Sequence, residues 1–397
     1  MENTIFQKNK WSFIGATYAF LIIMMGTTIP TPLYPIYSET YDLSPLLITM
    51  IYAVYAIGVI GGLLVFGQLS DRIGRRYILL PGIILSALSA LIFLFADSLL
   101  MLFAGRIVSG LSAGLFTSTA TVTLVNLVPQ NKKSIASTLA SIVNMLGLGL
   151  GPLLSGALVQ YLPFPMRLIF IIDFVTLIPA FMGVWFMTEP IQNKRPFKLK
   201  VQRLSVPSEM KHTFTYAVIP VFAGFSMLGL FTSISPNFLE ETLGIHHKAI
   251  IGIVVFLAFF ASAMGQLLFK SIDDYKILIV GSIALILGVA CVGLSLLLYS
   301  LAILILGAIT SGIGQAFSFR AGLSLINSKA PTKKQGEVTS SFFTIAYVAL
   351  SIPVIGVGLL EGAFGIQTAG IIFSIIIMLL SFLSLTLLLL SKKESSD

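Results

Sequence analysis

Three charged side chains fall inside stretches that are otherwise apolar, and they are the residues most able to do chemistry here. They are Arg106, Asp173 and Arg320. A charge in the interior of a bilayer is costly and usually faces a partner or a water-filled cavity. Asp173 is the only carboxylate that we place within such a stretch, so a pair with Arg106 would form a group that binds and releases a proton. Alternatively, Arg106 extends to the membrane surface, and Asp173 is a structural hydrogen-bonding residue.

Arg320 is the second candidate for a functional cation. It lies eleven residues before Pro331, which is about 16 Å along a helix, and reaching the inner surface over that distance would be strained. A cation fixed at this depth favours a substrate with an anionic group, or a carboxylate partner on another helix. Five further polar residues are candidates for lining a substrate cavity, although each also suits helix packing. These are Tyr52, Tyr55, Asn144, Gln315 and Tyr347.

The apolar stretches that hold these residues are long enough to cross a membrane. The 397 residues are 56% hydrophobic and 10% charged, against about 25% charged in a soluble globular chain. A helix that crosses a bilayer needs about 20 apolar residues. Stretches of this kind lie near residues 11–34, 45–69, 77–96, 99–127, 135–160, 167–187, 213–236, 249–269, 276–299, 301–327, 338–360 and 368–390. The sequence therefore predicts an all-α protein with twelve transmembrane helices in the cell membrane, which in a bacterium is the plasma membrane.

The positive charges predict how the helices are oriented. With the N-terminus inside, 20 of the 24 Lys and Arg residues fall in cytoplasmic segments, and only Arg167 and Lys248 fall outside. Because cytoplasmic loops carry an excess of Lys and Arg, both termini are predicted to be cytoplasmic. This distribution accounts for the net charge of +8, so nucleic acid is not an expected partner.

The chain divides near its middle. Residues 189–212 hold six basic residues and form the longest polar stretch, and a shift of 202 residues lays Ser109-Gly110 on Ser311-Gly312. The pattern predicts two pseudo-symmetric six-helix bundles, residues 1–188 and 213–397, joined by a cytoplasmic linker. Transporters with internal repeats bind substrate near the midplane and alternate access by rocking one bundle against the other.

A glycine-rich basic loop lies between the second and third stretches. Its sequence is Gly67-Gln68-Leu69-Ser70-Asp71-Arg72-Ile73-Gly74-Arg75-Arg76. Gly67 and Gly74 permit a tight turn, and Asp71 can accept hydrogen bonds from Arg75 or from nearby helix N-termini. The loop resembles the signature G-x-L-[AS]-D-R-x-G-R-[RK] of the major facilitator superfamily. The resemblance implies that Gly67, Asp71, Arg72, Gly74, Arg75 and Arg76 form a latch between the halves at the cytoplasmic side.

The fifth stretch carries Gly147-Leu148-Gly149-Leu150-Gly151-Pro152-Leu153-Leu154-Ser155-Gly156. Gly147, Gly151 and Ser155 recur on one helix face, where small residues let a partner helix approach. Pro152 leaves the carbonyl four residues earlier without its helical partner and favours a kink. The segment resembles the antiporter signature G-x3-G-P-x2-G-G of twelve-span drug:proton antiporters, with Ser155 in place of one glycine. Through Gly147, Gly151, Pro152, Ser155 and Gly156 this resemblance implies export.

The resemblance also implies a role for the arginine in the fourth stretch. Arg106-Ile107-Val108-Ser109-Gly110 resembles the R-x-x-Q-G element of the family, with Ser109 in place of glutamine. In the family this arginine acts in proton coupling on a nearby carboxylate, and in this chain the available carboxylate is Asp173.

Together these features predict a secondary transporter that exports a small amphipathic or drug-like molecule in exchange for protons, by alternating access. The alternative is an exporter or importer of a specific metabolite, such as a sugar, an amino-acid derivative or a metallophore, and Arg320 favours an anionic one. The expected partners are the lipid bilayer, the small-molecule substrate and protons, and we expect a monomer.

Enzymatic chemistry, a cofactor and a metal site are not expected. The chain has one Cys and three His, which is too few for most zinc sites. It also lacks the nucleotide-binding pattern G-x-x-x-x-G-K-[ST] and any recognisable nucleophile-base pair.

Overall fold

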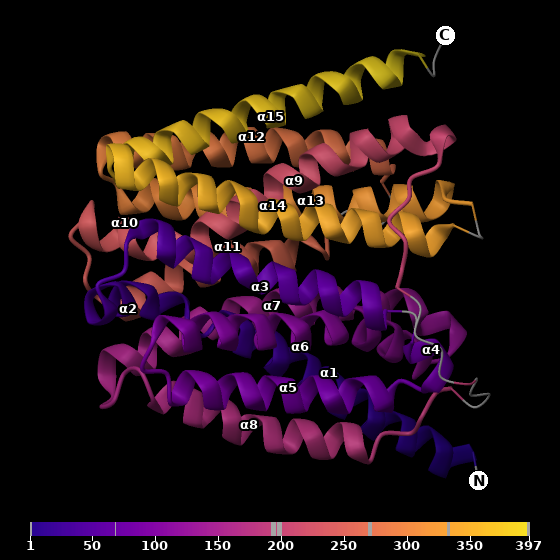
Figure 1. Ribbon diagram of the computed structural model, residues 1–397. Coiled ribbons are helices and arrows are strands. Elements are labelled where there is room, and N and C mark those ends of the chain that lie inside the picture. The colour runs from indigo at the N-terminus through magenta and orange to yellow at the C-terminus, as the bar shows by residue number, and fades with distance from the viewer. Residues whose placement is uncertain are drawn as a thin grey trace. The chain divides into compact units, whose positions relative to one another are not determined.

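A computed structural model describes residues 2–67, 69–191, 196, 201–268, 272–331 and 334–394, without the side chains of residues 2–9 and 391–394. Every regular element in this part of the chain is helical (Figure 1). Twelve helical segments are long and apolar enough to cross a membrane. The predicted all-α class with twelve spanning helices is therefore confirmed. Since an even number of crossings returns a chain to its starting side, both termini are expected on one side of the membrane.

The helices that precede the central polar stretch follow the predicted apolar segments closely. They are α1 (Glu2–Thr28), η1 (Thr31–Leu33), α2 (Tyr34–Tyr41), α3 (Pro45–Phe66), α4 (Ser70–Ile73), α5 (Arg76–Leu94), α6 (Leu99–Asn126), η2 (Gln130–Lys132), α7 (Lys133–Tyr161) and α8 (Leu168–Trp185). The first candidate span runs from Lys10 through η1 to Tyr41. Within it the helix breaks and restarts around Pro30 and Pro32.

The helices that begin at the end of the polar stretch, from Ser208 onward, repeat this pattern of long spans and short connections. They are η3 (Ser208–Met210), α9 (Lys211–Ser233), α10 (Ser235–Glu241), α11 (Lys248–Gly265), α12 (Asp274–Leu298), α13 (Leu301–Lys329), α14 (Gln335–Phe364) and α15 (Ile366–Glu394). One residue separates the last two helices. Gly365 takes φ +81°, a left-handed conformation that favours glycine, and so a single residue ends α14 and starts α15.

The chain forms two compact units, Met1–Leu33 with Val54–Gln202, and Tyr34–Ala53 with Arg203–Asp397. The second unit thus includes α2 and the N-terminal part of α3, in addition to the segment that begins at Arg203 inside the polar stretch. Within this unit α2 packs against α10, and Thr49 of α3 touches Gly358 of α14. Residues 192–195 and 197–200 of the predicted linker lie outside the described residues.

Small residues set the helix crossings of the first unit. A Cβ atom on Gly110 of α6 would lie 2.1 Å from the carbonyl oxygen of Tyr55, and one on Gly114 would lie 2.5 Å from that of Val59. Both distances are shorter than a van der Waals contact. The backbones of α3 and α6 therefore touch directly, as small-residue spacing permits in membrane helices.

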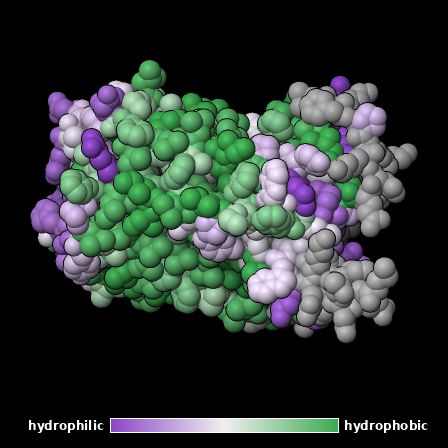
Figure 2. Space-filling model, turned by 90° about the horizontal axis from the view of Figure 1, so that it is seen from below, coloured by the Kyte–Doolittle hydropathy of each residue, from purple (hydrophilic) through white to green (hydrophobic). Residues whose placement is uncertain are grey.

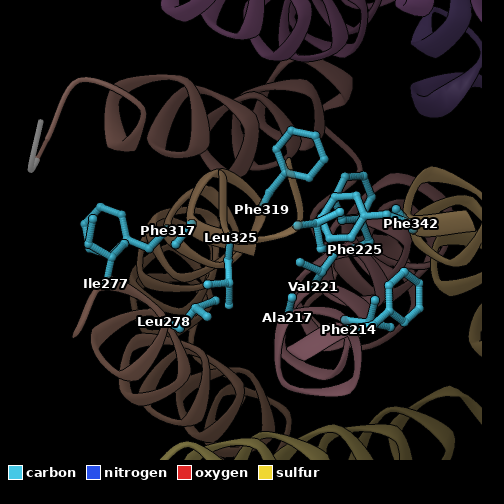
Figure 3. Close-up of a cluster of buried hydrophobic side chains, with 14 of the residues drawn as sticks. Phe214, Ala217, Val221, Phe225, Ile277, Leu278, Phe317, Phe319, Leu325 and Phe342 are labelled. Carbon is cyan, nitrogen blue, oxygen red and sulfur yellow. The ribbon is translucent and has the colours of Figure 1, made fainter. Parts of the chain in front are cut away.

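Aromatic packing fills the core of the second unit. The ring of Phe319 packs in a tilted arrangement against those of Phe225 and Phe342, with ring centroids 5.5 Å and 5.8 Å away, respectively. Figure 3 shows these rings, which come from α9, α13 and α14, in one buried cluster with Ile277 and Leu278 of α12, which lie on its opposite side. Such tilted arrangements are preferred between aromatic rings.

The surface carries the apolar band that a membrane-spanning chain needs. Figure 2 shows one face, on which hydrophobic residues cover the middle and hydrophilic residues gather toward both ends. Large apolar side chains such as Ile57, Leu100 and Leu379 are strongly exposed. Hydrocarbon is a suitable solvent for this band, because lipid tails are as apolar as the side chains.

Candidate functional site

The seam between α1 and α7 is built from the glycines of the antiporter-type segment. A Cβ on Gly147 would lie 2.6 Å from the Cβ of Met24, and one on Gly151 would lie 2.3 Å from Oγ1 of Thr28. No larger side chain fits at either position without a backbone shift. Gly147 and Gly151 therefore hold α7 directly against α1 over one turn of helix.

Pro152 lies at the centre of this seam. Proline cannot donate to the carbonyl of Leu148, four residues earlier in the helix. The hydroxyl of Thr28 donates to that oxygen instead, at 2.8 Å. The interruption in α7 is thus satisfied by a side chain of α1. Ser155 and Gly156, which complete the motif, are also buried.

Arg106 projects from α6 toward α1. Its side chain is only 2% exposed, and its Nη1 donates to the carbonyl oxygen of Thr27 at 2.6 Å. Its guanidinium carbon lies 4.6 Å from the centroid of the Tyr55 ring. This geometry is a cation–π contact, which is favourable away from water. The guanidinium is therefore buried within the unit and does not extend to the membrane surface.

Asp173 projects from α8 toward the neighbouring residue of α1. A Cβ on Gly26 would lie 3.1 and 3.2 Å from the two carboxylate oxygens. Asp173 is buried, and within the described residues its Oδ1 has no hydrogen-bond partner. Arg106 and Asp173 thus reach one turn of α1, at Thr27 and Gly26, but the carboxylate makes no ion pair with the arginine in the part of the chain described.

The loop between α3 and α5 contains the predicted cytoplasmic motif. Asp71 forms an ion pair with Arg75, whose Nη1 also donates to Oγ of Ser70 at 2.5 Å. Gly67 ends α3, and Gly74 takes φ +112°, a conformation that L side chains rarely adopt. Arg72 is half-buried in α4. Asp71 thus forms its ion pair with an arginine of the same motif, Arg75.

Glu189 completes this loop, although no sequence motif predicted a role for it. Its two carboxylate oxygens accept from the backbone N–H groups of Arg75 and Arg76, at 2.9 and 3.0 Å. It therefore caps the N-terminus of α5 from the segment after α8, where the helix dipole favours a carboxylate. The side chain of Arg76 donates to the carbonyl oxygen of Met187 in the same segment. One signal was present in the sequence, since Glu189 lies two residues after the sixth apolar stretch.

Arg320 caps a helix in the second unit. Its Nη1 donates to the carbonyl oxygens of Gln266 at 3.0 Å and Leu268 at 2.7 Å, just beyond the end of α11. A cation is favourable at a helix C-terminus, where carbonyl groups lack helical partners. The structure thus gives this arginine a capping contact, and a role in holding substrate stays a prediction.

The other cavity candidates lie in different surroundings. Gln315 is fully buried, and its Oε1 accepts from Oγ of Ser262 at 2.5 Å. In the described part of the chain, Nε2 of Gln315 and Oδ1 of Asn144 are buried without a hydrogen-bond partner. Tyr52 is buried and Tyr347 is partly buried. The structure does not bring these residues together in one unit, because Asn144 lies in the first and Gln315 in the second.

Acidic residues gather at α10, between two spans of the second unit. Glu240 forms an ion pair with Lys248. Burial, followed by the neighbouring charge of Glu240, raises the pKa of Glu241 above its usual range. Among the described residues, no group of three or more His, Cys, Asp or Glu side chains could hold a metal ion.

These features define a class of protein. Twelve apolar helices, a close-packed and proline-interrupted seam, and buried charges directed at one helix are typical of a secondary transporter. The profile of the Major Facilitator Superfamily matches residues 16–353. The chain belongs to this superfamily, as the loop motif predicted.

Known relatives agree with this family. The chain is 22% identical over 372 residues to an uncharacterized MFS-type transporter, MJ1560, of Methanocaldococcus jannaschii, covering 91% of this chain and 94% of that protein. It is 27% identical over 191 residues to a putative multidrug resistance protein, MdtD, of an Enterobacter species, covering 48% of this chain and 40% of that one. The second match thus spans less than half of either protein.

A solved structure supports the fold alone. It is a bacterial homolog of the human lysosomal transporter Spinster, in an inward-facing and unoccupied conformation, with a TM-score of 0.70 at 14% identity. The match covers 96% of this chain and 98% of that one.

Proposed function

We propose that this protein exports a small amphipathic or drug-like molecule in exchange for protons, by alternating access. The observation that carries the proposal is the seam between α1 and α7. There Gly147 and Gly151 bring the backbones together, and Thr28 satisfies the carbonyl that Pro152 leaves without a helical donor. A helix interrupted in this way can bend at one point while its packing stays intact.

Similarity to putative multidrug resistance proteins supports the same proposal. The putative multidrug resistance proteins that match this chain do so over 38–48% of its length. The expected setting is the plasma membrane of a bacterium, with the chain working as a monomer.

Coupling to protons is proposed to run through Asp173 and Arg106. Both side chains are buried, and they contact adjacent residues of α1, namely Gly26 and Thr27. A carboxyl in such a place is costly when charged. Gain or loss of its proton would therefore alter its contact with α1, which is also the helix that satisfies the interruption in α7.

The second candidate function is transport of an anionic metabolite. This alternative rests on Arg320 as a cation fixed within the membrane, and in the structure this arginine donates to two carbonyl oxygens at the end of α11. Since the guanidinium already has these partners, the export of amphipathic molecules is the function that the geometry supports better.

Transport into proteoliposomes tests both candidates. The purified chain is reconstituted with an imposed pH gradient, and uptake of a fluorescent lipophilic cation is compared with uptake of a fluorescent amphipathic anion. We expect the cation to accumulate only while the gradient is present. Accumulation that persists after a protonophore collapses the gradient would reject proton exchange, and transport of the anion alone would favour the second candidate.

The role of Asp173 is tested separately. Asp173→Asn keeps the size of the side chain but cannot release a proton, so gradient-driven uptake should be lost while binding of the fluorescent cation persists. Asp97→Asn is the matched control, because Asp97 is exposed between α5 and α6. If the Asp173 variant transports with the pH dependence of the parent, the residue is a packing residue and the coupling site lies elsewhere.

A further inference from the structure

A hollow of about 350 Å³ lies beside the first turns of the membrane-spanning part of α1, away from the residues used above. It is lined by Lys10 and Phe13 of α1, by Asn126 at the end of α6, by residues 127–129 that follow, and by Lys132 of η2. All of these residues belong to the first unit.

The hollow lies at the level of a membrane boundary. The first apolar stretch begins at residue 11, just after Lys10. Asn126 ends a second candidate span, and a third begins at Gln130. Three span ends therefore meet around the same space. Since the segments at these ends are rich in Lys, the positive-inside rule assigns this boundary to the cytoplasmic leaflet.

The hollow combines two cations with an apolar floor. Lys10 and Lys132 are exposed, and in the part of the chain described here neither ammonium group forms an ion pair. Leu127 is buried, and Phe13 and Val128 are partly buried. Lysines that only set the orientation of a helix in the membrane do not require apolar side chains beneath them. A phospholipid matches both features, because its anionic phosphate lies directly above apolar chains.

The start of α7 adds positive potential beside Lys132. This residue is the N-cap of α7 and makes no side-chain capping hydrogen bond. The backbone N–H groups of Lys132 and Lys133 already donate to the carbonyl oxygens of Pro129 and Gln130, so the contribution of α7 is its helix dipole, which favours an anion at this end. By contrast, the hollow of about 420 Å³ between α1 and α8 has no charged side chain in its lining.

We propose that the hollow at Lys10 and Lys132 binds the phosphate headgroup of an anionic phospholipid of the cytoplasmic leaflet. The two ammonium groups bind the phosphate oxygens. The glycerol end of the acyl chains lies over Phe13, Leu127 and Val128. Basic pockets between membrane helices on the cytoplasmic side are suited to anionic headgroups.

Thermal unfolding of the purified full-length protein in detergent tests this site. Phosphatidylglycerol is titrated against phosphatidylcholine with the same acyl chains, and against inorganic phosphate. We expect a saturable rise in melting temperature with phosphatidylglycerol only. The double variant Lys10→Gln, Lys132→Gln should weaken the apparent affinity by about tenfold or more. The single variants, each expected to show part of the loss, serve where the double variant does not fold.

Lys133→Gln is the matched control. Lys133 neighbours Lys132 and carries the same charge, but it does not line the hollow, so its replacement should leave the titration unchanged. A loss at Lys133 equal to that of the double variant would overturn the proposal, because charge alone would then explain the binding. An equal rise with phosphatidylcholine, or with inorganic phosphate, would also overturn it.

Discussion

The hydroxyl of Thr28 donates a hydrogen bond to the carbonyl oxygen of Leu148, 2.8 Å away and 120 residues later in the chain. The carbonyl is available because Pro152 has no N–H to donate to it. One side chain of α1 thus takes the place of a missing bond in α7. The same hydroxyl oxygen lies only 2.3 Å from the position that a Cβ on Gly151 would take, so the close approach of the helices and the hydrogen bond depend on each other.

Thr28→Val should destabilise the protein, because it removes the donor and keeps the shape of the side chain. A buried carbonyl left without a partner costs about 1–3 kcal/mol. The measurement is thermal unfolding in detergent, together with the transport rate in proteoliposomes. Thr28→Ser keeps the hydroxyl and should behave as the parent. Thr27→Val is the control, since that hydroxyl donates to Met24 in its own helix. Equal effects at both threonines would contradict the role of the bond.

Gly151→Ala should reduce both stability and transport. The added methyl would lie 2.3 Å from Oγ1 of Thr28 and 2.5 Å from the carbonyl oxygen of Met25, so the helices must separate. Overpacking of this kind costs about 1–3 kcal/mol. Gly356→Ala in α14 is the matched control, because nothing lies within 4 Å of its Cβ position. Unfolding temperatures and uptake rates of the two variants are compared, and an unchanged Gly151 variant would mean that the seam is looser than the structure indicates.

Glu189→Ala should destabilise the first unit by removing the cap of α5. Two backbone N–H groups, those of Arg75 and Arg76, lose their acceptor, which costs about 1–2 kcal/mol for a charged cap. Thermal unfolding measures the loss, and high salt should reduce the difference between variant and parent. Glu209→Ala, at an exposed glutamate before α9, should have little effect. A similar loss at both positions would argue against the cap.

The sequence predicted the fold because the evidence for a spanning helix is local. Each span needs its own apolar stretch, and its length can be counted without knowledge of its neighbours. The consequence of Pro152 was also local, since proline always deprives the carbonyl four residues earlier. The hydrogen bond that satisfies this carbonyl was not predictable, because its donor, Thr28, lies 120 residues away. No spacing rule connects the two positions.

The candidate site was harder to predict for the same reason. Arg320 was assigned a depth from its distance to Pro331, yet its guanidinium reaches carbonyl groups of Gln266 and Leu268 on another segment. How two helices are aligned depends on their packing, which a single sequence does not display. The role of Glu189 was not predicted because it depends on the loop at Arg75, which is distant in the chain.

Glu241→Gln should change how stability depends on pH. Burial, then the charge of Glu240, raises the pKa of Glu241, so the folded protein holds this proton more tightly than the unfolded chain does. The free energy of unfolding therefore falls as the pH rises from the ordinary range of Glu through the raised pKa. Glutamine does not ionise, so the variant does not lose stability in this way. It should melt above the parent at about pH 8, and the difference should vanish below about pH 4. The effect should be small, because the side chain is partly exposed and solvent screens it. The measurement is the melting temperature of variant and parent across this pH range. A difference that is constant with pH would show that the carboxyl does not titrate as its surroundings predict.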